Sequence, residues 1–178
     1  MTTNALCTVP FRLLRFNVCR YRLSHSKQLH SQANQLFGND GNTHLDLACG
    51  TGPHVRHFID FGFHSSGLDI NQPMLDMARV RCPEAFFFTQ NMSEFCVDEP
   101  LDLITCFLYS IHYNDGIEKL KTCIASVRRA LKTDGVFCFN VVDKTKINNT
   151  FFVKHTAIQA DDLFTFSSDW HYSGSVDK

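Results

Sequence analysis

The sequence predicts an α/β fold with a doubly wound, mostly parallel sheet and helices on both faces. Short apolar runs of strand length alternate with segments of helical period between residues 43 and 142, and this alternation is typical of βαβ units. The runs are apolar on both sides, as are the strands of a parallel sheet covered on both faces. A chain of 178 residues is long enough to bury one core of this kind.

Five short apolar segments are expected to be the strands. Each is rich in residues that suit a strand buried on both faces. Right-handed crossovers would join them in a parallel sheet. The five segments are 43–49, 65–70, 85–90, 101–107 and 135–142.

Three amphipathic helices are expected between these strands, over 53–61, 73–81 and 117–131. Each places apolar residues at helical spacing, which predicts one buried face. Pro53 and Pro73 fit the first turn of a helix, where the missing N–H costs nothing. The sequence LKTDG, which starts at the end of the third helix, predicts a helix exit into a turn.

The flanking segments complete the predicted domain organisation. Residues 1–40 are expected to be an N-terminal lead-in or helical arm, and residues 41–143 to be the ligand-binding core. Residues 144–178 contain NTFFVKHTAIQ and DLFTFSSDWHYSG, which are expected to be two extended segments. We expect them to form part of a lid or an antiparallel extension on the substrate side.

Composition excludes several classes of function. The formal net charge is −1, so a nucleic-acid partner is disfavoured, and no apolar run reaches the roughly 18 residues that would span a membrane. The eight cysteines contain no Cys-x-x-Cys pair, which favours a reduced, cytoplasmic protein. His54 and His57 lack the spacing of a helical metal site, so no metal is expected.

Two glycines, Gly50 and Gly52, follow the first predicted strand. Without Cβ atoms, their backbone lets a ligand reach the free N–H groups at the start of a helix. Asp69 ends the next strand, and a carboxylate about twenty residues after a glycine turn is placed to bind both ribose hydroxyls. Each residue alone also has a structural explanation, as a turn or a cap. Val55 replaces the third glycine of a dinucleotide site, which disfavours NAD.

Five ordered stretches resemble one enzyme family. They are LDLACGTG, GLDINQPMLDMARVRCPEA, TQNMSEF, LDLITCFLYSIHY and VRRALKTDGVFCFNVV. They resemble class I S-adenosylmethionine-dependent methyltransferases, in the small-molecule branch with nucleotide-sugar N-methyltransferases and glycine or sarcosine methyltransferases. The resemblance implies a Rossmann-like fold, S-adenosyl-L-methionine as cofactor, and in-line methyl transfer to a nitrogen or oxygen of a small molecule.

The resemblance also implies a set of cofactor-binding residues. Asp46 and the glycine loop would accommodate the methionine part, Asp69 the ribose, and Ile70 the adenine. The full set is Asp46, Ala48, Gly50, Gly52, Asp69, Ile70, Met74, Asn91, Met92 and Phe107. The family usually has an acidic residue before an apolar one at the adenine edge, whereas this chain has Asn91 before Met92. We expect the Asn91 carbonyl to accept from the adenine amino group and the Met92 N–H to donate to the ring, with the contact weakened rather than abolished.

The methyl acceptor is expected after the fourth predicted strand, where the resemblance places it. Tyr109, His112 and Tyr113 are the polar aromatic residues of that segment. Methyl transfer requires mainly that donor and acceptor are held together, and an amine acceptor must arrive neutral. His112, which titrates near neutrality, is therefore the expected base or substrate-orienting residue.

The chain also departs from the family after residue 142. The terminal strand hairpin of the family is expected to be absent, which suggests a C-terminally truncated product or a fragment. The last strand of the sheet would then have an uncovered edge, and copies of the chain could associate there as a homo-oligomer. Two alternative functions stay open: a catalytically inactive, truncated protein that binds S-adenosylmethionine, and an RNA or protein methyltransferase.

Overall fold

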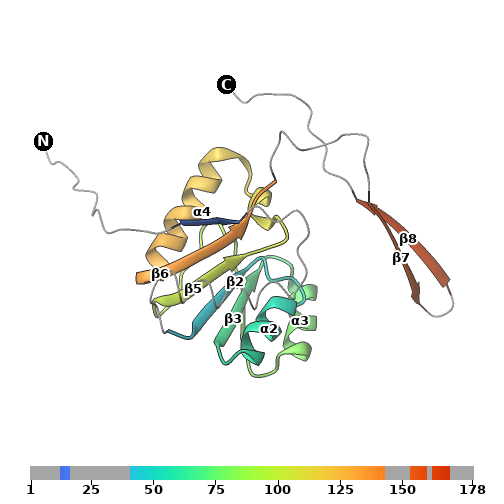
Figure 1. The fold of residues 1–178 in the computed structure, drawn as a ribbon, viewed down its shortest axis with the longest axis horizontal. Helices are drawn as coiled ribbons and strands as arrows, with labels where there is room; N and C mark the ends of the chain where they lie inside the picture. Colours follow the sequence, from blue (N-terminus) through green and yellow to red (C-terminus); the bar gives the residue numbers. More distant parts are fainter. Residues whose placement is uncertain (1–12, 17–40, 143–152, 160–161, 169–178) are drawn as a thin grey trace, which may run out of the picture. The chain divides into compact units, whose positions relative to one another are not determined.

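The computed structural model describes residues 13–16, 41–142, 153–159 and 162–168 (Figure 1). The chain divides into two compact units, Met1–Val141 and Val142–Lys178, which are described separately. Among the described residues, no helix is both long and apolar enough to cross a membrane.

The first unit contains a six-stranded sheet in which every strand pair is parallel. Its strands are β1 (Leu13–Phe16), β2 (Thr43–Leu47), β3 (His64–Asp69), β4 (Phe86–Thr89), β5 (Leu101–Cys106) and β6 (Leu131–Asn140). Their order is β1-β6-β5-β2-β3-β4. All five predicted strands are therefore present. The winding direction reverses between β2 and β5, and ligands bind at such points outside the carboxyl ends of the strands.

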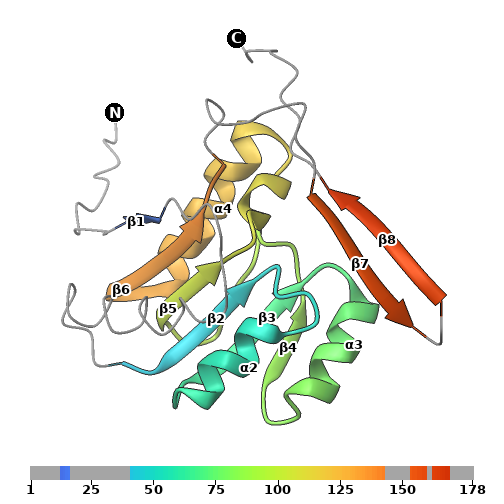
Figure 2. The same ribbon diagram turned by 45° about the vertical axis from the view of Figure 1, so that its right-hand side comes forward.

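Helices cover both faces of this sheet, which confirms the doubly wound class. They are α2 (Pro53–Asp60), α3 (Gln72–Arg81) and α4 (Gly116–Ala130), with a short 3-10 helix, η2 (Ser110–Tyr113), before α4. Figures 1 and 2 show α2 and α3 on one face and α4 on the other. Pro53 and Pro73 lie in the first turns of α2 and α3, as predicted.

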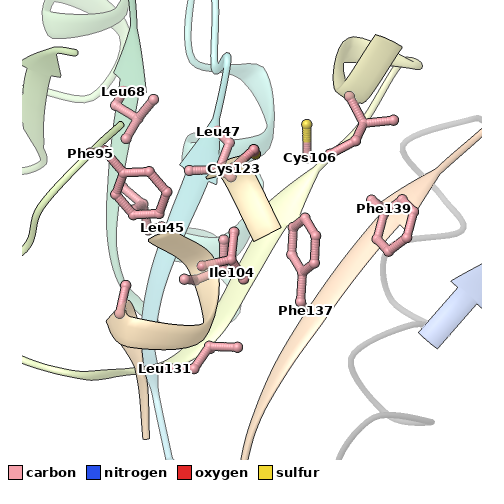
Figure 3. Close-up of a cluster of buried hydrophobic side chains, with 13 residues drawn as sticks. Leu45, Leu47, Leu68, Phe95, Ile104, Cys106, Cys123, Leu131, Phe137 and Phe139 are labelled. Carbon is pink, nitrogen blue, oxygen red and sulfur yellow. The ribbon is translucent and has the colours of Figure 1, made fainter. Parts of the chain in front are cut away.

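The largest buried cluster lies between the sheet and α4 (Figure 3). Leu45 and Leu47 on β2 pack there with alternate residues of β5 and β6, and Cys123 and Val127 of α4 are wholly buried. Phe95, from the segment between β4 and β5, fills the side near β3. Alternate residues of a strand face opposite sides, so the residues between these apolar ones point towards α2.

The face that points towards α2 carries an unusual number of buried polar residues. His44, Asp46, Thr105 and Asn140 are all at most 2% exposed. Around them lies a smaller apolar cluster that includes Phe58 of α2. Buried polar groups require hydrogen-bond partners, so this face of the sheet is built around a polar network.

The outer edge of β6 is paired with β1 over four residues. Leu13–Phe16, within the segment expected to be a lead-in or helical arm, is a strand that runs parallel to β6 with Leu13 opposite Phe137. An unpaired strand edge leaves a row of N–H and C=O groups without partners, and pairing with β1 covers this edge over Phe137–Asn140. Homo-oligomerisation through the sheet edge stays a prediction.

The expected turn at the end of α4 lies within the range of β6. Leu131 pairs with Leu101 and the next pair of the ladder is Val136 with Leu103, so the register shifts and four residues of β6 lie opposite one of β5. The three residues after Leu131 are exposed, and a Cβ built on Gly135 would lie 3.1 Å from the Leu131 Cβ. The chain therefore folds back on itself between Leu131 and Gly135, as the sequence predicts.

The second unit contains an antiparallel hairpin of β7 (Val153–Gln159) and β8 (Asp162–Ser168), with Val153 opposite Ser168. Both segments that were expected to be extended therefore form strands over these residues. The predicted boundaries of the domains, and the role of residues 144–178 as a lid or substrate-side extension, stay predictions.

Candidate functional site

The candidate site starts at the loop between β2 and α2, where the backbone has an unusual conformation. Ala48, Gly50 and Gly52 have φ angles of 53°, 54° and 77°, in the left-handed region that favours glycine. Of the residues that the structure describes, only Met74 would have an atom within 4 Å of a Cβ on Gly50, its sulfur at 3.7 Å. The backbone of Gly50 therefore borders open space in which a ligand can lie.

Asp69 lies beside this loop and is held by backbone donors on two sides. The Gly50 N–H donates to Oδ2 at 2.9 Å, and the Asn71 N–H donates to Oδ1 at 2.9 Å. Each carboxylate oxygen can accept a further hydrogen bond. The carboxylate is thus oriented before any ligand arrives, and it keeps acceptor capacity for a pair of hydroxyl groups.

Gly52 has a packing role in addition to its conformation. A Cβ at this position would lie 3.1 Å from the Cβ of Ala78 on α3 and 3.5 Å from the ring of Phe87 on β4. Close packing of α2 on α3 and β4 therefore requires a glycine at this position. The predicted contact of Gly52 with the cofactor stays a prediction.

Asp46 lies on β2, just before the glycine loop, and is 1% exposed. The Thr105 hydroxyl donates to Oδ1 at 2.6 Å, whereas Oδ2 has no hydrogen-bond partner among the described residues. His54 Nδ1, from α2, lies 3.5 Å from Oδ2, and the His54 ring packs edge-on against Phe107. The structure thus joins two predicted cofactor residues, Asp46 and Phe107, through His54.

A line of hydrogen bonds continues from Asp46 to the interior of the sheet. Since the one hydroxyl proton of Thr105 goes to Asp46, its oxygen accepts from His44 Nε2 at 2.9 Å. His44 Nδ1 then accepts from the Ser65 hydroxyl at 2.6 Å. Burial lowers the pKa of His44 to about 3, against the nearby charge of Asp46, which acts to raise it. His44 is therefore neutral at physiological pH.

The predicted adenine-side residues surround the carboxyl ends of β3 and β4. Ile70 is 72% exposed and Met74 is 43% exposed, directly after Asp69. The backbone N–H of Gln90 donates to the Asp69 carbonyl at 3.2 Å, which brings Asn91 close to the same strand end. Large apolar side chains left exposed beside a fixed carboxylate suit the flat face of a nucleobase.

Asn91 differs from the open acceptor that was expected. Its Oδ1 accepts from the backbone N–H and from the hydroxyl of Ser93, both at 2.9 Å. An amide oxygen has two lone pairs, so the turn of the chain already uses this acceptor. The neighbouring Met92 is half-buried, with its sulfur 3.8 Å from Asn114 Nδ2.

The predicted acceptor residues share one segment after β5, on the opposite side of β2 from Asp69. Leu108 and Tyr109 both have positive φ angles, 54° and 64°, although neither is a glycine. Such a conformation costs energy and persists only where the surroundings hold it. The Tyr109 N–H donates to Asn140 Oδ1 at 3.0 Å, so buried Asn140 anchors this turn.

His112 and Tyr113 lie in η2, and both are exposed. Desolvation lowers the pKa of His112 below its usual value. The neutral imidazole, which can accept a proton, is therefore favoured at neutral pH. Among the described residues no cluster of three or more potential metal ligands was found.

Four residues of the site were not expected from the sequence: His54, Asn71, Thr105 and Asn140. His54 was considered only as a metal ligand, and Thr105 was treated as part of an apolar strand. What they share in the sequence is that a polar residue lies within or directly after an apolar segment. Because alternate residues of a strand face the same side, such polar residues of neighbouring strands can share a face of the sheet, as His44, Asp46 and Thr105 do.

Sequence comparisons point to one family. A family model described as a methyltransferase domain matches residues 45–135, just over half of the 178 residues. The chain is 34% identical over 93 residues to the dTDP-3-amino-3,4,6-trideoxy-alpha-D-glucopyranose N,N-dimethyltransferase of Streptomyces venezuelae, covering 52% of this chain and 39% of that protein. It is 30% identical over 128 residues to the ubiquinone biosynthesis O-methyltransferase of Actinobacillus pleuropneumoniae serotype 7 (strain AP76), covering 66% of this chain and 51% of that protein. The chain thus spans between about two fifths and about half of the length of these relatives.

Solved structures share the fold at low sequence identity. DesVI of Streptomyces venezuelae matches with a TM-score of 0.72 at 19% identity, covering 82% of this chain and 74% of that one. CalS10, an amino pentose methyltransferase from Micromonospora echinaspora solved with S-adenosylmethionine bound, matches with a TM-score of 0.64 at 17% identity, covering 86% and 82%. With its parallel sheet, glycine loop and matching family model, the chain belongs to the methyltransferase domain family, in its class I, Rossmann-like form.

Proposed function

We propose that this chain binds S-adenosyl-L-methionine at the carboxyl ends of β2, β3 and β4, and that the protein transfers its methyl group to a small molecule. The observation that carries the proposal is the Asp69 carboxylate, fixed by the N–H groups of Gly50 and Asn71 at 2.9 Å each. Its remaining acceptor capacity suits the two hydroxyls of a ribose.

The residues around Asp69 fit the rest of the cofactor. Gly50 offers backbone without a Cβ beside open space, and Ala48 and Gly52 share its left-handed conformation. Within the part of the chain that the structure describes, Asp46 Oδ2 is buried without a hydrogen-bond partner, and an ammonium group such as that of methionine would satisfy it. Phe107 closes this side through its contact with His54. The methionine part therefore belongs near Asp46.

The nucleobase belongs on the other side of Asp69. We assign its flanking contacts to Ile70 and Met74, which are exposed there, and its edge to Asn91 and Met92. These residues follow β3 and β4, whereas the glycine loop follows β2. A nucleoside would then lie across three neighbouring strand ends.

The methyl acceptor belongs at the segment after β5. When bound, the cofactor supplies an electrophilic methyl group on a sulfonium. We assign the orientation of the acceptor to Tyr109 and Tyr113, and the removal of its proton to His112, whose lowered pKa favours the neutral base. Asn140 holds the turn that carries these residues.

The substrate class follows from the relatives. One relative methylates the amino group of a nucleotide sugar according to its name, and another is an O-methyltransferase of ubiquinone biosynthesis. We therefore propose a small-molecule acceptor with a nitrogen or oxygen nucleophile. Residues 144–178, which include the hairpin of β7 and β8, are assigned to the substrate side as an extension.

Calorimetric titration tests the cofactor. The chain should bind S-adenosyl-L-methionine and its demethylated product S-adenosylhomocysteine, and it should not bind NAD. A shift of the melting temperature by the same ligands provides an independent readout. Binding of NAD in preference to both sulfur nucleosides would overturn the proposal.

A further inference from the structure

We infer that Asn91 presents its amide nitrogen, a hydrogen-bond donor, to the edge of the nucleobase, and that this chain therefore does not favour adenine over a base with a carbonyl at the same position. The inference rests on the proposed function, which places the ribose of a nucleoside at Asp69. The contact in question joins Asn91 Nδ2 and the exocyclic group at position 6 of a purine base.

The sheet determines where the base lies. The glycine loop follows β2 on one side of Asp69, and β4 is the neighbour of β3 on the other side. A nucleoside with its 5′ side at Gly50 and its ribose at Asp69 extends its base towards β4. Asp69 pairs with Thr89, and the Gln90 N–H donates to its carbonyl at 3.2 Å. Asn91 is thus the first side chain beyond this pairing.

The hydrogen bonds of Asn91 identify its two amide atoms. A backbone N–H can donate only to an oxygen, so the atom 2.9 Å from the Ser93 N–H is Oδ1. The Ser93 hydroxyl donates to the same oxygen at 2.9 Å, and the Glu94 N–H closes the turn on the Asn91 carbonyl at 3.0 Å. Ser93 is 2% exposed, so the turn is anchored in the protein. Oδ1 is therefore committed, and Nδ2 is the polar atom that remains for a ligand.

The chemistry of the base edge follows directly. Adenine carries an amino group at position 6, which is a donor, whereas a 6-oxopurine carries a carbonyl there, which is an acceptor. Two donors facing each other form no hydrogen bond, but Nδ2 and a carbonyl do. An aspartate at position 91 would keep one oxygen in the turn and present its second oxygen to the base. Asn91 thus replaces an acceptor with a donor while the turn is preserved.

The test compares S-adenosylhomocysteine with S-inosylhomocysteine, its hypoxanthine counterpart, in which a carbonyl replaces the amino group at position 6 and N1 carries a hydrogen. The difference at N1 is the same for the wild type and the variant, so a change in the ratio of the two affinities reports on residue 91. Calorimetry on the wild-type chain should show that the hypoxanthine compound binds at least as tightly as the adenine compound. Asn91→Asp should bind the adenine compound about tenfold more tightly than the wild type does, and it should lose affinity for the hypoxanthine compound. The ratio of the two affinities should therefore shift by more than about tenfold.

Asn71→Asp is the matched control. Asn71 caps α3 through its own Oδ1, which accepts from the Met74 N–H at 3.2 Å, and aspartate caps a helix as well as asparagine does. This variant adds the same charge at the neighbouring strand end. It should leave the ratio of the two affinities unchanged, whatever its effect on each affinity alone.

Two results would overturn the inference without touching the proposed function. One is a wild-type preference for the adenine compound of about tenfold or more. The other is an unchanged ratio in Asn91→Asp with both ligands still bound. If the wild-type chain binds neither compound, the placement of the ribose at Asp69 fails, and both proposals fall together.

Discussion

The Thr105 hydroxyl donates a 2.6 Å hydrogen bond to Asp46 Oδ1 and accepts one from His44. Because a hydroxyl has one proton, these two bonds give the whole line from Ser65 to Asp46 a single direction. The line fixes one oxygen of Asp46 and leaves the other beside His54. The interior of the sheet thus orients a carboxylate that we assign to the ligand.

Removal of the Thr105 hydroxyl should destabilise the fold. Thr105→Val leaves Asp46 Oδ1 and His44 Nε2 buried without partners, at about 1–3 kcal/mol each, so we expect a loss of about 2–6 kcal/mol in the free energy of unfolding. Thr105→Ser keeps the hydroxyl and should lose no more than about 1.5 kcal/mol, the cost of a methyl group. Urea denaturation measures both. Equal stability of the two variants would contradict the role of the hydroxyl.

His44 should make the fold sensitive to acid. Its folded pKa is about 3, below the usual value of 6.5, so between these values the unfolded chain takes up a proton that the folded chain does not. Stability from this group is complete above pH 6.5 and falls as the pH falls, by about 2 kcal/mol at pH 5. His44→Gln lacks this proton uptake. Its free energy of unfolding should therefore fall less steeply between pH 7.5 and pH 5, and parallel slopes would contradict the prediction.

Gly50 and Gly62 offer a matched pair, because both have positive φ angles and a Cβ at either would find little or no contact. Alanine in this conformation is strained, so both Gly50→Ala and Gly62→Ala should lose about 1–2 kcal/mol of stability. Only Gly50→Ala should weaken the binding of S-adenosylhomocysteine, because its methyl group enters the proposed ligand space. Similar calorimetric affinities for the two variants would contradict this placement.

Asp69→Asn should weaken cofactor binding by about tenfold or more. The substitution keeps the size of the side chain but removes the charge and one acceptor, and hydrogen bonds to charged groups contribute about 1.5–3 kcal/mol each. Asp76→Asn is the control, because Asp76 is exposed on α3 and pairs with Arg79. It should bind S-adenosyl-L-methionine like the wild type. If Asp69→Asn binds the cofactor as tightly as this control does, the proposed contact of the ribose with Asp69 is contradicted.

His112→Ala should lower methyl transfer more than cofactor binding. The lowered pKa of His112 predicts that kcat/KM of the wild type declines only as the pH falls below 6.5, because the neutral form accepts the proton. The variant should lose this acidic limb of the pH profile. The assay would follow transfer to an amino-sugar nucleotide. If the pH profile of kcat/KM is the same for the wild type and for His112→Ala, the decline at low pH belongs to another group.

The alternation of apolar runs and helical periods was sufficient to predict five of the six strands of the sheet, because both signals are local. Leu13–Phe16 gave no such signal: its pairing partner on β6 lies far along the chain, and only the assembled sheet creates the edge that it fills. The pairing of Leu131 with Leu101, which comes before the turn, was missed for a related reason, since it depends on the register with β5.

The candidate site divides in the same way. Gly50 and Asp69 were expected together, because a bare turn and an acidic strand end are visible in the sequence. The link from His44 through Thr105 was not expected, because it joins residues of different strands. Asn91 was partly predictable. The sequence shows an asparagine where the family usually has an acidic residue, but only the structure shows that its Oδ1 accepts hydrogen bonds from Ser93.

The pairing of β1 with β6 has a consequence for biosynthesis. Residues 13–16 are translated before the other five strands of this sheet, whereas Phe137, opposite Leu13, lies in the strand that is translated last. The first strand of the sheet to be made must therefore wait for the last, and such long-range closure slows folding and exposes nascent chains to aggregation.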